Sequence, residues 1–359
     1  MGSSMLLRRQ EAKATAFSDA DKRQGGHAAS GIEASKESAW PSGGGQGRFG
    51  QAARPGEEAR NGNSLVKLNG NGMMLLCAAA PCLPPFRPGF WKPSAMKHAA
   101  ASCPPAPLIL TESYGPHEGQ AGDLYLPDQP HPAVVCLFHG GFWRMPYGRE
   151  QMHAIAQDLA AGGFAVWNLG YRRIGAPTGG WPNTGEDALR GIEYLSELAG
   201  KGMDLDLNRV ALVGHSAGGH LALWAAAQAL KGVRVRAVAG EAPVSDLQAA
   251  HRLGLGRGAA QALLGATPEE RPESYAAASP LRLLPLGIPQ LLVHAIDDDA
   301  VPIEMSRTYA AAARAAGDSI RLLELPDSSH MAFLDPASSA HDAVREWLSA
   351  ALEGESTDE

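Results

Sequence analysis

Two short stretches, far apart in the chain, contain the residue types that can activate a hydroxyl group. The first is Gly214-His-Ser-Ala-Gly218, a G-x-S-x-G pattern between an apolar run at 210–213 and an Ala- and Leu-rich stretch at 217–230. The apolar run favours a buried strand and the Ala-rich stretch favours a helix. At so sharp a turn, glycines permit close backbone approach and the serine is exposed above the sheet. We predict that Ser216 is a nucleophile; the alternative is a glycine turn whose serine does no chemistry.

The second stretch supplies a base and an acid, which a serine hydroxyl needs before it can attack a carbonyl carbon. A strand predicted at 290–296 runs into three consecutive aspartates at 297–299, and a strand predicted at 320–325 runs into Pro326-Asp-Ser-Ser-His330. His330 is the only histidine between those aspartates and the predicted closing helix. We therefore expect His330 to be the base. The residues alone leave open which of the three aspartates orients it.

A third stretch could stabilise the negative charge that develops on the attacked carbonyl oxygen. The run His139-Gly140-Gly141-Phe142-Trp143 follows an apolar strand predicted at 133–138. Paired glycines let the backbone approach a reacting carbonyl, so N–H groups of this loop and of Ala217 are expected to form an oxyanion hole. The histidine of the run is expected to hold the loop. Its two aromatic residues and Trp181 either line an acyl or aryl pocket or pack in the core.

Regular alternation of apolar runs and helical stretches begins at residue 108 and predicts the scaffold for these residues. The predicted strands are 108–114, 123–126, 133–138, 164–168, 210–213, 235–239, 290–296 and 320–325, and the predicted helices are 149–161, 186–198, 217–230, 303–316 and 339–350. This alternation predicts an α/β fold whose mostly parallel sheet has helices on both faces, after an antiparallel start. Residues 244–288 interrupt the rhythm and are expected to form a small insertion over the site.

Composition divides the chain into three parts. Residues 1–107 are rich in Gly, Ser, Pro and Ala and are predicted to be a disordered extension; 108–352 form the folded domain, and 353–359 an acidic tail. The extension has a net charge of +6 and the remainder has a net charge of −13. The acidic remainder argues against nucleic acid as the substrate. No apolar run is long enough to span a membrane.

The cysteines and the N-terminal residues bear on the compartment. Four cysteines in no disulfide or metal-ligand spacing indicate a reduced protein without a bound metal, and we expect a cytoplasmic location. A weak targeting segment or a later start within the extension is the alternative.

Together, these motifs resemble the α/β-hydrolase family, specifically its esterase branch with a His-Gly-Gly oxyanion loop. The run from His139 to Trp143 is similar to the H-G-G-x-W motif of kynurenine formamidases, which hydrolyse an N-formyl aryl amide. A D-x-x-V-P pattern follows the seventh strand of those enzymes, and Asp298-Asp-Ala-Val-Pro302 matches it. The resemblance thus implies that Asp298 is the acid and that Gly141 and Phe142 donate to the oxyanion. It departs from the H-G-G-G carboxylesterases at Phe142, which replaces their third glycine.

The motifs and the resemblance lead to one expected function. We expect a serine hydrolase without a cofactor that cleaves a small carboxylic ester or an N-formyl aryl amide through an acyl-enzyme. One alternative is a serine peptidase-like hydrolase; the other is a non-catalytic binding protein on the same fold. The substrate is expected to be a small molecule in each enzymatic case.

Overall fold

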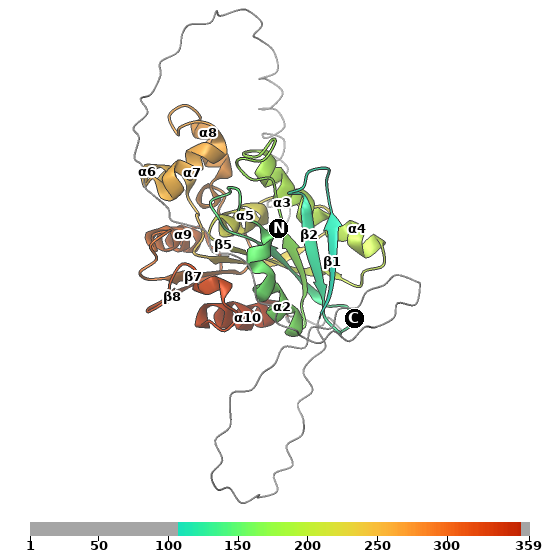
Figure 1. Ribbon diagram of the computed structural model, residues 1–359. Coiled ribbons are helices and arrows are strands. Elements are labelled where there is room, and N and C mark those ends of the chain that lie inside the picture. The colour runs from blue at the N-terminus through green and yellow to red at the C-terminus, as the bar shows by residue number, and fades with distance from the viewer. Residues whose placement is uncertain (1–106, 353–359) are drawn as a thin grey trace, which may run out of the picture. The chain divides into compact units, whose positions relative to one another are not determined.

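The centre of the fold is an eight-stranded sheet with the strand order β1-β2-β4-β3-β5-β6-β7-β8 (Figure 1). The computed structural model describes residues 107–352, so the predicted extension and acidic tail lie outside the described residues. Strands β1, β2 and β4 pair in antiparallel fashion, whereas all pairs from β4 through β3 to β8 are parallel. The predicted mostly parallel sheet with an antiparallel start is confirmed.

The strands follow the predicted apolar runs closely. Their bounds are β1 Leu108–Ser113, β2 Ala121–Leu126, β3 Ala133–Phe138, β4 Ala165–Leu169, β5 Asp206–His215, β6 Val235–Glu241, β7 Gln290–Ala295 and β8 Ile320–Leu325. Strand β5 begins before the predicted run, because Asp206 also pairs with Ala133 across an irregularity in the register. All six residues of β3 and of β7 are buried, as expected for strands covered on both faces.

The helices connect the strands, and three of them differ from the prediction. The helical elements are η1 Arg149–Met152, α2 His153–Ala161, α3 Asn183–Glu193, α4 Leu195–Gly200, α5 Ala217–Ala226, α6 Leu247–Arg252, α7 Leu255–Leu264, α8 Pro272–Ala278, η2 Pro280–Arg282, α9 Glu304–Ala315, η3 Ala332–Leu334 and α10 Ser339–Leu352. The helix predicted at 149–161 begins with a 3-10 turn. The helix predicted at 186–198 is divided at Tyr194, whose ring stacks on Trp167 of β4. The helix predicted at 217–230 ends at Ala226.

Two hydrophobic cores lie on opposite faces of the sheet, because successive side chains of a strand point to opposite sides. In β3, Val134, Cys136 and Phe138 belong to the core beneath α3, α4, α5 and α9. The alternate residues Val135 and Leu137 belong to the core beneath α2 and α10. Alternate residues of each strand thus supply apolar side chains to both faces of the sheet, and helices cover both faces.

The insertion at 244–288 contains α6, α7 and α8, which Figure 1 shows gathered apart from α2 and α10. Side chains and backbone of the main fold hold it in place. Trp224 of α5 donates from its indole to the Ala277 carbonyl at 3.0 Å. The Trp181 N–H donates to the Leu263 carbonyl at 2.8 Å. Helices α7 and α8 are thus attached to the main fold by hydrogen bonds to their backbone carbonyls.

No helix within residues 107–352 is both long enough and apolar enough to cross a membrane.

A buried ion pair holds the loop between β4 and α3. Asp187 of α3 is almost fully buried, and its carboxylate accepts two hydrogen bonds from the Arg172 guanidinium, at 2.7 and 2.8 Å. It also accepts the Arg172 backbone N–H at 2.8 Å and the side-chain amide of Gln120 at 2.7 Å. This geometry satisfies both carboxylate oxygens and fixes the loop that carries Tyr171, which contacts the predicted oxyanion loop.

Replacing Asp187 by Ala is expected to lower the free energy of unfolding by about 3–5 kcal/mol, because the buried Arg172 charge loses its partner. Urea denaturation of both proteins measures the difference. Glu186→Ala is the matched control, since Glu186 is the exposed neighbour on the same helix, and it should change stability by less than about 0.5 kcal/mol. Equal stability of the two variants would contradict the assigned role of Asp187.

Candidate active site

The turn between β5 and α5 places Ser216 in a backbone conformation that non-glycine residues rarely adopt. Its φ is 56° and its ψ −117°. A Cβ on Gly214 would lie 2.2 Å from the Gly218 carbonyl oxygen, and one on Gly218 would lie 2.0 Å from the Phe138 carbonyl oxygen. No side chain fits at either glycine, because the backbones of β3, β5 and α5 are in contact there. Both glycines of the G-x-S-x-G pattern are therefore required, because a Cβ at either position would clash with backbone atoms.

Backbone hydrogen bonds hold Ser216 in this conformation. Its N–H donates to the Glu241 carbonyl at the end of β6, at 2.8 Å. Its carbonyl accepts the N–H of His220 at 3.1 Å and of Val244 at 3.3 Å. Within residues 107–352, the hydrogen bonds of Ser216 are those of its backbone, so its hydroxyl makes none.

His330 and Asp298 are brought together from two different loops. The His330 Nδ1–H donates to Asp298 Oδ2 at 2.7 Å. The other carboxylate oxygen accepts the N–H of Ala300 at 2.9 Å and of Val301 at 2.8 Å. Burial alone would raise the pKa of Asp298, but the hydrogen bonds from His330 and the two N–H groups lower it below its ordinary value. Asp298 is therefore an ionised acid that orients the imidazole through Nδ1.

The three adjacent aspartates have different surroundings. The side chain of Asp298 is fully buried, whereas Asp297 and Asp299 are exposed. Only Asp298 among the three contacts His330 in the described part of the chain. This is the pairing that the D-x-x-V-P pattern implied, although the catalytic role of each residue stays a prediction.

His215 joins the His330 loop to the serine turn. Its Nε2–H donates to the His330 carbonyl at 2.8 Å, and the two imidazole ring centres are 4.6 Å apart. Burial lowers the pKa of His215 to about 3, so its ring is neutral. Because His215 directly precedes Ser216, this hydrogen bond fixes the predicted base next to the predicted nucleophile. In the sequence, His215 was only the variable second residue of the pattern, and its role was not predicted.

The predicted oxyanion loop runs directly against Ser216. A Cβ on Gly140 would lie 3.3 Å from the Ser216 Cβ. The next three residues all have positive φ: 102° at Gly141, 53° at Phe142 and 55° at Trp143. No acceptor within residues 107–352 receives the N–H of Gly141, Phe142 or Ala217. All three predicted oxyanion donors therefore lack a protein acceptor in the described part of the chain.

His139 and Trp143 anchor the two ends of that loop. The His139 ring stacks on Tyr171 at 4.2 Å, and its Nδ1–H donates to the Gly140 carbonyl at 2.8 Å. Burial lowers the pKa of His139 to about 3, which makes it a neutral structural group. The Trp143 indole donates to His220 Nδ1 at 3.2 Å, and His220 Nε2–H donates to the Ala278 carbonyl at 2.8 Å.

The position of Trp143 decides between its two predicted roles. Its side chain is 1% exposed and belongs to the core. Trp181 packs edge-on against Trp224 at 4.8 Å between ring centres. Trp143 therefore packs in the core, whereas Trp181 and Phe142 are both partly buried and pack against that core. The partner of Trp143 is His220, and the only sign of it in the sequence is that a second histidine closes the stretch Gly214–His220.

Glu241 is a further polar residue at the site that the sequence analysis did not single out. It is fully buried, and neither carboxyl oxygen has a hydrogen-bond partner within residues 107–352. Burial raises its pKa to about 8. Its carbonyl holds the Ser216 N–H, so this acid lies directly behind the serine turn. No local signal in the sequence marks it, because its isolation depends on the strands and helices that surround it.

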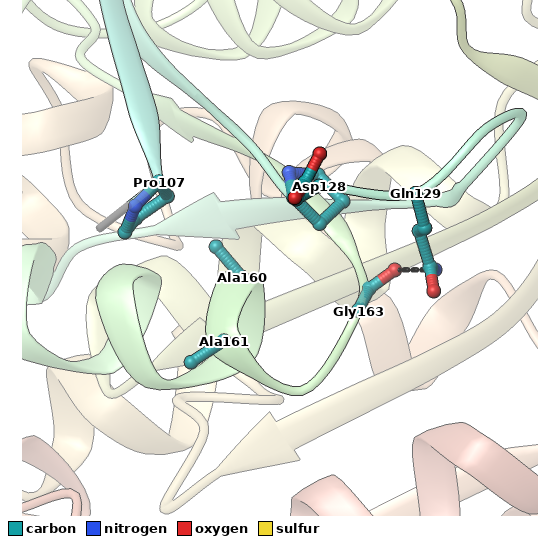
Figure 2. Close-up of a pocket in the computed structure, with 7 residues that line it drawn as sticks. Pro107, Asp128, Gln129, Ala160, Ala161 and Gly163 are labelled. Atoms are coloured by element: carbon teal, nitrogen blue, oxygen red, sulfur yellow. Dashed lines mark hydrogen bonds between the residues drawn. The ribbon is translucent and has the colours of Figure 1, made fainter. Parts of the chain in front are cut away.

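The described chain also contains a surface depression of about 260 Å³ (Figure 2), lined by Pro107, Pro127, Asp128, Gln129, Ala160, Ala161 and Gly163. It lies where β3 and β4 begin, whereas the predicted site residues follow the ends of β3, β5, β7 and β8. The Gln129 side-chain amide donates to the Gly163 carbonyl beside it. This depression contains none of the predicted site residues and is not the candidate active site.

Comparisons with known proteins agree with this architecture. The BD-FAE family model matches residues 123–312, more than half of the chain. A probable isoprenylcysteine alpha-carbonyl methylesterase of Oryza sativa is 27% identical over 277 residues, covering 70% of this chain and 65% of the relative. The esterase LipC of Mycobacterium tuberculosis is 27% identical over 237 residues, covering 60% and 58%. A kynurenine formamidase of Danio rerio is 33% identical over 120 residues, covering 32% and 37%.

The solved structures show the fold. A truncated carbohydrate esterase from gut microbiota superposes with a TM-score of 0.59 at 21% identity, covering 69% of this chain and 97% of that one. An esterase of Thermogutta terrifontis superposes with a TM-score of 0.55 at 21% identity, covering 70% and 96%. The chain spans about three fifths of the length of the first two curated relatives. The predicted fold class and the resemblance to esterases of this fold are confirmed.

The unusual pKa of Glu241 predicts how stability depends on pH. Between about pH 4.5 and 8 the folded protein keeps a proton that the unfolded chain has lost, so stability falls as pH rises through this window. Glu241→Gln has no such proton. As pH rises through the window, we expect the unfolding free energy of the variant to increase relative to that of the wild type by about 1.4 kcal/mol per pH unit.

Urea denaturation at pH 5, 6.5 and 8 measures this difference. Glu186→Gln is the control, because Glu186 is exposed and the variant should parallel the wild type. If the curves of Glu241→Gln and the wild type were parallel, Glu241 would not be a buried neutral acid.

Proposed function

The chain belongs to the BD-FAE family, an esterase family with the α/β-hydrolase fold, and we propose that it is a serine hydrolase. Its proposed substrates are small carboxylic esters or N-formyl aryl amides, cleaved through an acyl-enzyme. One observation carries the proposal: the 2.7 Å hydrogen bond from His330 to ionised Asp298, formed beside the strained turn of Ser216. A base that is oriented by an acid beside a serine in a strand-to-helix turn is the arrangement that nucleophilic catalysis requires.

In the proposed first step, His330 Nε2 removes the Ser216 hydroxyl proton while Oγ attacks the substrate carbonyl carbon. The oxygen becomes an oxyanion, which accepts hydrogen bonds from Ala217 and from the loop donors Gly141 and Phe142. Each such donor lowers the barrier by about 3 kcal/mol. The imidazolium then gives its proton to the leaving oxygen or nitrogen, and the acyl group stays on Ser216.

In the second step, water attacks the acyl-enzyme and His330 takes its proton. The returning proton goes to Ser216 Oγ as the carboxylic acid or formate leaves. Asp298 stays ionised throughout, because its hydrogen bonds lower its pKa, and it stabilises the imidazolium in both steps. The chemistry uses only residues of this chain and water.

The relatives support both substrate classes. Two of them are named as esterases, and one is named as a kynurenine formamidase over a shorter match. The insertion contributes to a small pocket in this proposal, because α6, α7 and α8 are 6, 10 and 7 residues long and none is a long amphipathic helix for an oil surface. We therefore propose short acyl groups, from formyl to about butyryl, on an apolar or aryl leaving group.

The test of this function is covalent labelling together with turnover. A fluorophosphonate should label the wild type at Ser216, and Ser216→Ala should remove both the label and the hydrolysis of p-nitrophenyl acetate. Losses in such triads are on the order of 10⁴–10⁶ in kcat. N-formylkynurenine and p-nitrophenyl octanoate, assayed beside the acetate, separate formamidase from esterase and short from long acyl groups. Undiminished activity in Ser216→Ala would refute the mechanism, and absence of labelling would favour a non-catalytic binding protein.

A second prediction concerns the acid. Asp298→Asn should lower kcat by roughly 10⁴, because the amide would hold His330 in the wrong tautomer. Asp297→Asn is the matched control: Asp297 is the adjacent, exposed aspartate, so its change should alter kcat less than about threefold. Steady-state kinetics with p-nitrophenyl acetate measure both. A large loss in Asp297→Asn with none in Asp298→Asn would reassign the acid.

A further inference from the structure

A short glycine-rich segment of the insertion has an unusual backbone. Residues 254–258, here called the strap, include four with left-handed φ: 65° at Gly254, 56° at Gly256, 56° at Arg257 and 75° at Gly258. Such values are strained for residues with a Cβ and unstrained for glycine. The strap connects α6 to the regular part of α7.

The strap touches the predicted oxyanion loop at two points. A Cβ on Gly256 would lie 2.3 Å from Phe142 Cδ1, 2.6 Å from Cγ and 2.7 Å from Cε1, so the Gly256 backbone lies against the Phe142 ring. The Arg144 guanidinium donates to the Gly256 carbonyl at 2.7 Å. It also reaches the Arg257 carbonyl at 3.4 Å.

These contacts bear on the loop residue that matters most for the proposed reaction. Phe142 carries one of the proposed oxyanion donors on its backbone, and its ring lies against the Gly256 backbone. The next residue, Trp143, is fixed in the core by its bond to His220. The loop is therefore held from the inside by Trp143 and from the strap side by Gly256 and Arg144.

We propose that Gly256 is a specificity-determining residue. Because it has no side chain, the Phe142 ring can lie against its backbone, and the position of this ring determines the space for the acyl group of the substrate. This inference rests on the proposed serine hydrolase function. A side chain at position 256 would push the ring away from the strap, toward the rest of the oxyanion loop. The space for the acyl group would shrink, so longer acyl groups would lose more than short ones. Loosening the strap would have the opposite effect.

The central test compares Gly256→Ala with Gly258→Ala. Both substitutions place a Cβ at a left-handed φ on the same strap, but nothing lies within 4 Å of the Cβ position at Gly258. Both variants carry the same kind of backbone strain, but only the new Cβ of Gly256→Ala contacts the Phe142 ring. We expect the ratio of kcat/KM for p-nitrophenyl butyrate to that for p-nitrophenyl acetate to fall on the order of tenfold in Gly256→Ala. In Gly258→Ala the ratio should stay within about twofold of the wild type.

Two further variants keep the inference testable if Gly256→Ala does not fold. In a Phe142→Ala background the clash is gone, so Gly256→Ala should no longer change the butyrate-to-acetate ratio. Arg144→Gln adds no bulk and removes the hydrogen bonds to the strap, so it should raise that ratio.

The outcomes separate this inference from the proposed function. If the wild type neither hydrolyses the acetate nor labels with a fluorophosphonate, both fail. If the wild type is active but Gly256→Ala and Gly258→Ala have the same ratio, only the role of Gly256 fails. An unchanged ratio in Arg144→Gln would likewise overturn it while leaving the serine hydrolase function intact.

Discussion

The candidate site depends on the contact of three backbones at a point where no Cβ fits. Gly214 meets Gly218 across the turn, and Gly218 meets the carbonyl of Phe138. Ser216 is forced to a positive φ by this approach, and the hydrogen bond from its N–H to Glu241 holds it there. The cost of such a conformation is about 1–3 kcal/mol, which the surrounding backbone bonds must offset. The predicted oxyanion loop begins directly after Phe138, so this contact also bears on the start of the loop.

Neutral histidines organise the loops around this contact. Burial lowers the pKa of each of the four, His139, His215, His220 and His294, so each acts as a neutral donor rather than a charge. Each donates to one backbone carbonyl, respectively those of Gly140, His330, Ala278 and Val301. His330 differs, because it donates to the carboxylate of Asp298. The ionised group beside the predicted base is thus a single carboxylate, which gives the imidazolium of the proposed reaction one counter-ion.

Patterns local in the sequence were sufficient for the fold and for the selection of Ser216 and His330 as candidate site residues. A β-branched run before the two glycines of the G-x-S-x-G pattern predicts a strand-to-helix turn, and the structure contains this turn. The choice of Asp298 needed a family resemblance, because three adjacent carboxylates are equivalent in sequence and differ only in burial. Glu241 could not be recognised, since its isolation depends on which strands and helices surround it. The Phe142–Gly256 contact joins residues 114 positions apart and has no local signature.

Hydrogen bonds attach the insertion to the main fold. Its carbonyls at Leu263, Ala277 and Ala278 accept hydrogen bonds from tryptophan and histidine groups of the main fold. Those bonds hold α7 and α8 on the same core as α5. In the strap, Leu255 packs against the core, whereas Gly254 and Gly258 have open space around their Cβ positions. Phe142 and Arg144 contact Gly256. Because the Gly256 backbone lies against the Phe142 ring, we propose that a change in the strap alters the oxyanion loop through Phe142, while the glycines of the serine turn hold that turn independently.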